Sequence, residues 1–277
     1  MNIRNSKYII IFLSALFTLN ISAQENTSEG ENTFMGPILD QTPYTKDAFL
    51  RGVEYSVRAG YEIGGTSPLP LPAEIRKIEG FKPGFHFYIE GNINKSFGIK
   101  KRWGLLLGLR LDQKGMKTKA QVKNYFMRME GDKDEEIEGP FTGHVDTEVN
   151  NAYLSIPVLA TFKASDRWKL RLGPYYSHLI GDKSEDRFFG KAYNGYIREK
   201  TPTGGYIEVS SADYDFSEEL RRWNIGVQFG AEWKVLKHLA IALDLQWGLT
   251  DIFNNDFEVI TFGMYPVYGN IGIAYLF

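Results

Sequence analysis

The sequence contains no cysteine. Disulfide bonds, thiolate metal sites, thiol nucleophiles and a lipid-modified amino-terminal cysteine are therefore all excluded. An excess of charge of one sign is lacking too, because 32 basic and 34 acidic residues leave a formal net charge of -2. Such a chain has no field that would hold a polyanion, so no nucleic acid partner is expected.

Long hydrophobic runs are also missing. Beyond the amino terminus no apolar run approaches the roughly 20 residues that a transmembrane helix needs. Yet 43% of the 277 residues are hydrophobic and 14% are aromatic, which excludes a disordered or collagen-like chain. The composition leaves open a transmembrane β-barrel, in which lipid-facing residues alternate with polar ones.

The amino terminus has the pattern of a secretory signal peptide. Arg4 and Lys7 precede the apolar stretch Tyr8–Leu19, and Ala23 offers a small residue at a cleavage point. We therefore expect a signal peptide over residues 1–23. Residues 24–50 have the composition of a loop, and we expect a periplasmic amino-terminal extension there, followed by a barrel over residues 51–277.

From residue 51 onward the dominant pattern is alternation with period two, which indicates strands with one apolar and one polar face. In Trp223–Val235 every odd position is apolar, and every even position is polar or glycine. The same template predicts eight strands: Gly52–Tyr61, Gly84–Phe97, Trp103–Asp112, Ala152–Lys163, Trp168–Gly181, Trp223–Val235, Leu239–Leu249 and Tyr265–Phe277.

The predicted connections alternate in length. A few residues join strands two and three, four and five, and six and seven, whereas residues 64–83, 114–150, 183–221 and 252–264 form long links. Single-chain bacterial barrels have an even strand number, short periplasmic turns and long outer loops. The sequence therefore predicts an all-β fold: an eight-stranded antiparallel up-and-down transmembrane β-barrel in a bacterial outer membrane, with both termini in the periplasm.

The tryptophans bear on the choice between lipid and water. All five lie on the apolar parity at or near strand ends, as in the aromatic girdles of membrane barrels. A soluble lipocalin-like barrel would turn the same apolar parity inward, and parity alone does not distinguish the two. Girdle placement and unequal connections favour the membrane. The predicted girdle is Trp103, Trp168, Trp223, Trp233, Trp247 and Phe277.

Several segments resemble a known family. They are Tyr153–Lys163, Arg171–Gly181, Trp223–Trp233, Gly248–Asn254 and Asn270–Phe277, and they resemble the PorT-type outer-membrane β-barrel family, porin-like proteins of Bacteroidota. The resemblance spans residues 52–277 and rests on structural motifs. The sequence departs from the commonest form at Ser155, where a carboxylate is frequent before Ile-Pro. The resemblance implies eight strands, and the name-giving member assists assembly of the type IX secretion machinery.

Side chains fill the lumen of an eight-stranded barrel, so a diffusion pore is not the first expectation. The inward parity carries acids and bases that we expect to pair, because an unpaired buried charge is costly. We interpret them as structural packing rather than as a proton or ion relay. The predicted lumen charges are Glu54, Arg58, Glu90, Arg110, Asp112, Lys169, Arg171, Glu232 and Asp244.

A hydrolase would need a nucleophile and a histidine on one face. Ser177 and His178 are neighbours, so in a strand they point to opposite faces. His86 is expected to face inward, while His144 falls in a predicted loop and His238 in a predicted turn. We expect no catalytic, cofactor-binding or metal-binding residues, and no cofactor.

Two predicted loops carry the most distinctive side chains. Lys117–Met129 is basic and aromatic, and Phe188–Ile207 is rich in tyrosine. Such loops can contact lipopolysaccharide phosphates, surface glycans or a partner protein. The alternative is that they are hairpins continuing the strands above the membrane.

The sequence thus predicts a monomeric, non-enzymatic outer-membrane barrel, a structural or assembly and secretion accessory acting through its long loops or its periplasmic face. The expected partners are outer-membrane lipid, lipopolysaccharide and a protein of a secretion or transport complex. Two alternatives stay open. One is a narrow porin-like solute channel, and the other is a surface adhesin or lipid-A-modifying enzyme.

Overall fold

The computed structural model describes residues 52–98, 100–130, 136–181, 187–198, 205–257, 259–260 and 262–277. The predicted signal peptide and amino-terminal extension lie outside these residues. The described elements are β1 (Val53–Pro68), β2 (Ile75–Phe97), β3 (Trp103–Glu130), β4 (Glu136–Lys163), β5 (Trp168–Ile180), β6 (Phe188–Arg198), β7 (Tyr206–Asp215), a short 3-10 helix η1 (Ser217–Glu219), β8 (Trp223–Lys234), β9 (Leu239–Gly248) and β10 (Met264–Leu276). Within the described ranges, no helix has the length and apolar character needed to cross a membrane.

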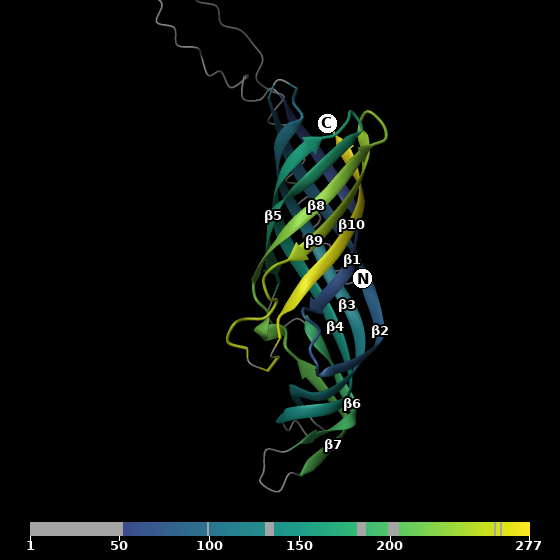
Figure 1. The fold of residues 1–277 in the computed structure, drawn as a ribbon, viewed down its shortest axis with the longest axis vertical. Coiled ribbons are helices and arrows are strands. Elements are labelled where there is room, and N and C mark those ends of the chain that lie inside the picture. Colours follow the sequence, from purple (N-terminus) through teal and green to yellow (C-terminus); the bar gives the residue numbers. More distant parts are fainter. Residues whose placement is uncertain are drawn as a thin grey trace, which may run out of the picture. The chain divides into compact units, whose positions relative to one another are not determined.

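The strands form a closed antiparallel ring in the order β1-β10-β9-β8-β5-β4-β6-β7-β3-β2, with β3 and β4 also paired directly (Figure 1). The ring is closed at its ends by β1 and β2. Ring closure pairs the edges of the barrel strands, which is the condition for placing a sheet in lipid, where no water satisfies backbone polar groups.

The prediction of eight strands in total was wrong, because the described residues contain ten. The eight predicted segments each fall on a strand, and β6 and β7 lie in the predicted connection 183–221. β6 takes over the edge of β4 where β5 ends: Ala152 pairs with Ile180 of β5, and Val149 pairs with Phe188 of β6. This segment is therefore a hairpin that continues the sheet, as the alternative interpretation held.

β3 and β4 are far longer than predicted. Each has 28 residues, whereas a tilted strand needs about 9–11 to cross a bilayer. Their pairing runs from Trp103 opposite Phe162 to Glu130 opposite Glu136. Lys117–Met129 is thus part of β3, and here too the alternative interpretation, a hairpin that continues the strands, holds.

In this part of β3 the apolar side chains face inward and the polar ones face outward, the reverse of the barrel strands. Ala120 and Val122 are buried, while Lys119 and Gln121 are exposed. Apolar side chains therefore point inward here, as they do in a strand surrounded by water on its outer face. A search for outward-facing apolar residues misses such a strand.

The two ends of the ring differ. The short turns β2–β3, β4–β5 and β8–β9 lie at one end together with the carboxyl terminus, where the Leu276 amide donates to the His238 carbonyl at 2.9 Å. We call this the turn end. The extended end comprises residues 117–130 of β3, 136–148 of β4, β6 and β7 (Figure 1). The short turns lie at one end as predicted, but most of the predicted long link 114–150 is strand, because β3 runs to Glu130 and β4 begins at Glu136.

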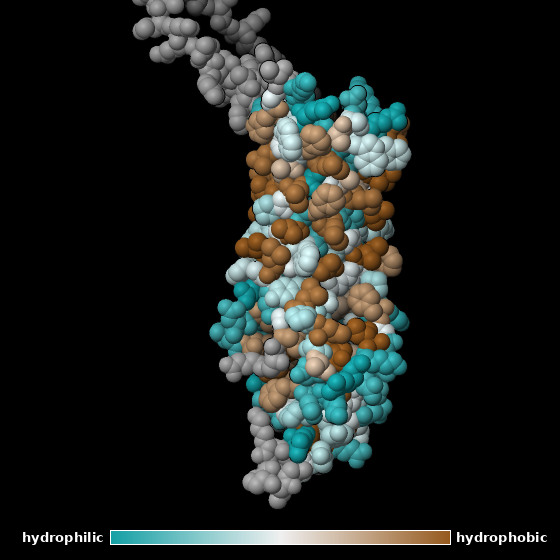
Figure 2. Space-filling view, viewed as in Figure 1, coloured by the Kyte–Doolittle hydropathy of each residue, from teal (hydrophilic) through white to brown (hydrophobic). Residues whose placement is uncertain are grey.

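The apolar parity faces outward. In β8, Phe229 is 54% exposed, whereas Gln228 is completely buried. The same alternation continues through β9. On the face seen in Figure 2, apolar side chains are concentrated over the barrel strands, and polar side chains gather at both ends. This arrangement excludes the lipocalin-like alternative, which requires apolar residues inside.

The interior changes character along the strands. Toward the turn end it is lined by charged and polar side chains, and toward the extended end by an apolar core. On β3 the change falls between Lys114 and Met116, both buried. The apolar core includes Met116, Ala120, Val122, Met127, Phe141, Val145, Val149, Phe188, Tyr214, Phe216 and Met264.

Candidate functional site

Charged side chains from seven strands meet inside the turn-end half of the barrel. Alternate side chains of a strand point to opposite faces, and each of these residues lies at a position whose side chain faces the lumen. Among the described residues the set contains six acids and six bases joined by ion pairs, so its formal charges balance. This lumen network consists of Glu54, Arg58, Glu62, Glu90, Arg110, Asp112, Lys114, Lys163, Lys169, Arg171, Glu232 and Asp244.

Part of the network crosses the lumen. Arg58 on β1 donates to Glu232 on β8 at 2.7 Å, although β9 and β10 lie between these strands in the ring. Arg110 on β3 reaches Gln228 on β8 at 3.1 Å. These contacts join opposite walls, so the side chains themselves fill the lumen at this level.

Most of the remaining pairs are equally buried. Arg110 lies 2.9 Å from Asp112 and 3.0 Å from Glu90, and Arg171 lies 2.9 Å from Asp244. Arginine suits such positions because its planar group makes several directed hydrogen bonds to carboxylates. Each buried carboxylate of these pairs thus has a cationic partner, which offsets the cost of taking it out of water.

Lys114 is the last charged side chain before the interior becomes apolar. Its ammonium lies 3.6 Å from Asp112, 3.7 Å from Glu62 and 3.1 Å from the amide oxygen of Gln246. The rings of Tyr153, Tyr175 and Tyr268 surround it, each with its centroid 5.4 Å away. Carboxylates and aromatic faces therefore hold one cation at the boundary.

At the turn end the network opens to solvent. Glu54 accepts from Lys163 at 2.5 Å and from Lys169 at 3.0 Å. These groups line a cavity of about 350 Å³ to which Arg167 and Lys237 also contribute. The turn-end mouth of the lumen is therefore predominantly basic.

The structure places all nine predicted lumen charges in the network. Sequence reasoning missed Glu62, Lys114 and Lys163. Glu62 and Lys114 lie just beyond the predicted ends of their strands, and they continue the inward parity of Arg58 and Asp112. Continuing the inward-facing alternation slightly past the predicted end of each strand would have identified both residues.

The predicted girdle residues all point outward. Trp168 and Trp233 stack at the turn end with ring centroids 6.1 Å apart, and Trp223 and Trp247 lie toward the other end of β8 and β9. The six side chains are exposed: Trp103, Trp168, Trp223, Trp233, Trp247 and Phe277.

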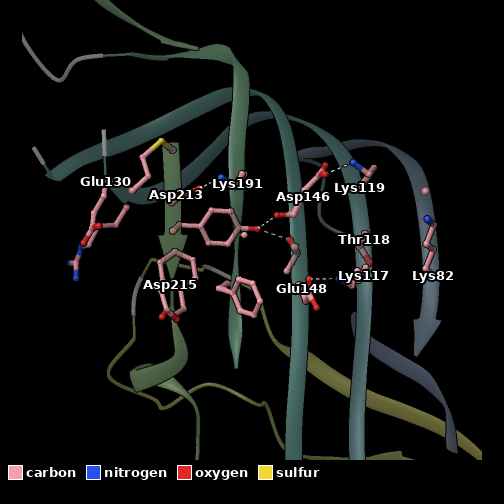
Figure 3. A pocket seen from close by; sticks show the side chains of 18 residues that line it. Lys82, Lys117, Thr118, Lys119, Glu130, Asp146, Glu148, Lys191, Asp213 and Asp215 are labelled. Carbon is pink, nitrogen blue, oxygen red and sulfur yellow. Dashed lines mark hydrogen bonds and ion pairs between the residues drawn. The ribbon is translucent and has the colours of Figure 1, made fainter. Parts of the chain in front are cut away.

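The extended end carries a second charged cluster (Figure 3). Lys119 pairs with Asp146, and Lys117 lies 2.5 Å from Glu148, so both pairs join β3 to β4. Lys191 of β6 lies 3.1 Å from Asp213 of β7. The hydrogen bond to Asp146 raises the pKa of Lys119. These pairs line a cavity of about 830 Å³, which we call the charged cavity.

No hydrolytic arrangement is present in the described residues. The Ser177 hydroxyl lies 2.6 Å from that of Ser155, which donates to Asp112. His178 faces the other side and contacts Tyr176. No serine–histidine hydrogen bond occurs in the described part of the chain, and within it no group of three or more histidine, aspartate or glutamate side chains is arranged to hold a metal ion.

The sequence matches the outer membrane protein beta-barrel domain family over residues 22–254, and the chain belongs to this family. No curated protein matches it. It is similar to crystal structures of the attachment invasion locus protein Ail of Yersinia pestis (12% identity, 81% of this chain and 99% of that chain, TM-score 0.37) and of OprG from Pseudomonas aeruginosa (11%, 81% and 95%, 0.32). Neisserial surface protein A is similar at 11% identity, 81% and 96% coverage and a TM-score of 0.33. The family match identifies the chain as a bacterial outer-membrane β-barrel protein.

Proposed function

We propose that this barrel is a non-enzymatic, non-conducting accessory of a secretion or transport assembly, and that it binds its partner protein through the extended end. In this proposal the extended end lies outside the cell, both termini lie in the periplasm, and the barrel is a monomer in lipid and lipopolysaccharide. The resemblance to PorT-type barrels supports an assembly role.

The lumen network supports the absence of conduction. Arg58 and Arg110 reach across the lumen to Glu232 and Gln228, so a solute would have to displace buried ion pairs. Breaking such a pair leaves a buried charge without a partner, at a cost of about 3–5 kcal/mol. The porin-like alternative therefore ranks second.

The length of β3 and β4 is the observation that carries the binding role. A membrane barrel needs only about 9–11 residues per strand, and the 28 residues of each strand project a sheet well past that requirement. β6 and β7 widen this sheet beyond the edge of β5. Its exposed lysines and acids supply the polar, charged surface that specific protein recognition uses.

The test is quantitative mass spectrometry of proteins that co-purify with the tagged barrel from its own membrane. An extended-end variant, Lys117→Glu with Lys119→Glu and Lys191→Glu, is compared with a turn-end control, Lys234→Glu with Lys237→Glu. All five lysines lie outside the lumen network. We expect wild type and control to retain one stoichiometric partner, and the extended-end variant to lose it.

Three results would overturn the proposal. Loss of the partner in the control alone would transfer the role to the turn end. A barrel that purifies alone in every case would remove the accessory role. Steady ion conductance of the wild-type barrel in a planar bilayer would make it a channel instead.

A further inference from the structure

A second cavity of the extended end, which we call the apolar cavity, has a volume of about 560 Å³. It is lined by the end of β1, the first half of β2, parts of β3 and β4, the start of β6, the end of β7, and the start of β10 with the segment before it. No charged side chain lines it in the described part of the chain. Its volume falls in the range of about 300–1,000 Å³ that is usual for small-molecule sites.

The cavity is blind on its inner side. Met116 and Val267 line the cavity. Met116 lies two residues after Lys114, and Val267 directly precedes Tyr268, whose ring contacts Lys114 at the boundary. The lumen network closes the barrel immediately beyond these residues. A ligand would thus enter from the extended end and stop at this boundary.

The lining suits an unbranched hydrocarbon chain. Three methionines, Met116, Met127 and Met264, contribute to it, and their flexible thioether side chains adapt to a chain's shape. Gly65 has no side chain, and a β-carbon there would lie 2.8 Å from the Met116 sulfur. Glycine at this position therefore keeps one wall of the cavity thin.

The mouth of the cavity carries exposed apolar side chains. Its exposed lining residues are Leu71, Ile78 and Phe81, and the last two stand on β2. Further along β2, Phe85 and Phe87 are also exposed. Exposed apolar side chains therefore occur along β2 from Phe87 to the mouth, which provides a path for a hydrocarbon chain between the apolar surface of the barrel and the cavity.

Two basic side chains of β2 flank the exposed part of the lining. Arg76 and Lys82 are exposed on either side of Ile78 and Phe81, and in the described part of the chain neither has an ion-pair partner. Lys82 also stands directly opposite Lys117 in the β2–β3 pairing. Because Lys117 is already paired with Glu148, an anionic head group near the mouth would be held by Arg76 and Lys82.

We propose that the apolar cavity binds the hydrocarbon chain of an anionic membrane lipid, with the head group held by Arg76 and Lys82. The chain fills a space that offers water no charged partner, and these two side chains supply the charge that the lining lacks. This inference goes beyond the accessory role and does not depend on the partner protein.

The methionines provide the measurement. Of the six in the sequence, Met116, Met127 and Met264 line the apolar cavity, while Met129 is buried outside its lining and serves as an internal control. The barrel, labelled with ¹³C at its methionine methyls, is placed in nanodiscs of chain-deuterated phosphatidylcholine with added protonated phosphatidylglycerol. We expect nuclear Overhauser contacts from the phosphatidylglycerol chains to the three lining methyls and none to Met129.

Two variants test the position of the chain. Ala120→Phe adds a ring inside the cavity, and Gln121→Phe adds the same ring on the outer face of the same strand. We expect Ala120→Phe to reduce the contacts about tenfold, since the ring occupies the chain's volume, and Gln121→Phe to leave them unchanged. The wild-type measurement stands on its own if Ala120→Phe fails to fold.

The remaining arms decide the ligand's head group and source. Protonated phosphatidylcholine in place of phosphatidylglycerol is expected to give weak contacts, and equal contacts would overturn the role of Arg76 and Lys82. Contacts from added hexadecanoate but not from phosphatidylglycerol would overturn the membrane lipid as the source. Absence of contacts with every probe, or equal contacts to Met129, would overturn the site.

Discussion

The guanidinium of Arg58 donates to the carboxylate of Glu232 at 2.7 Å across the lumen, from β1 to β8. Two strands of the ring separate these residues, so the pair ties opposite walls of the barrel rather than adjacent ones. Arg58 also lies 3.1 Å from Glu90 on β2. One buried cation therefore links three strands, and the barrel is closed by its own wall residues.

The outward apolar parity predicts different fates for two adjacent substitutions. Val227→Asp puts a charge on the lipid-facing side, where a basic residue costs about 2–4 kcal/mol near the midplane and an acidic one somewhat less. Gln228→Asp puts the charge inside the lumen, where Arg110 donates to the Gln228 amide oxygen at 3.1 Å, and we expect it to be tolerated. Folding yields in lipid vesicles should fall for Val227→Asp only. Equal yields would contradict the assignment of faces.

Removing one cation from the lumen network should be costly. Arg110→Ala leaves Glu90 and Asp112 buried beside each other without their shared partner. We expect the free energy of unfolding to fall by about 3–5 kcal/mol, measured by urea unfolding in vesicles. The matched control is Lys191→Ala, which removes an exposed pair and should cost less than about 1 kcal/mol. A small and equal effect of both would show that the network contributes little.

Glycine is required where β1 meets β10. A β-carbon at Gly60 would lie 2.1 Å from the backbone oxygen of Ile271, whereas one at Gly80 would meet nothing closer than 3.9 Å. Backbone atoms of a closed ring have little freedom to shift. Gly60→Ala should therefore lower the folded fraction, seen as loss of the fast-migrating folded band in gel electrophoresis, while Gly80→Ala folds as wild type. Normal folding of Gly60→Ala would contradict the tight β1–β10 contact.

The extended end should loosen at alkaline pH. Burial raises the pKa of the Tyr214 hydroxyl, which donates to the Asp146 carbonyl at 2.9 Å. An unfolded tyrosine ionises near pH ~10, so above that pH the unfolded state releases a proton that the folded state keeps. Stability from Tyr214 is thus complete below pH ~10 and falls by about 1.4 kcal/mol per further unit.

Unfolding midpoints measured against pH, with near-ultraviolet absorbance reporting tyrosinate, check this expectation. Tyr214→Phe has no proton to lose at this position, so its midpoint should depend less steeply on pH above ~10. The same slope in wild type and Tyr214→Phe would remove Tyr214 as the cause.

The barrel strands were predictable because lipid imposes a strong alternation on them. Val227 and Phe229 face hydrocarbon, and Gln228 faces the lumen, so each position has one acceptable chemistry. The inward charges Arg58 and Arg110 followed from the same parity. Their partners across the lumen did not, because alternation assigns a face to a residue and says nothing of which distant strand lies opposite.

The extended end was harder to predict because its outer face meets water. Lys119 and Gln121 point outward there and Ala120 inward, which reverses the pattern that identifies the membrane-spanning part of β3. Lys117–Met129 therefore looked like a polar loop. The period-two alternation continues through this segment. It indicates a strand only if the inward face is allowed to change from polar to apolar between Lys114 and Met116.

Site-specific photo-cross-linking in the native cell tests the central claim most directly. A photoreactive residue is placed at Gln121 or Lys191 of the extended end, or at Lys237 of the turn end, all exposed and outside the lumen network. The account predicts that Gln121 and Lys191 both cross-link to one and the same protein and that Lys237 does not. A cross-link from Lys237 alone, or none from either extended-end position, would contradict it.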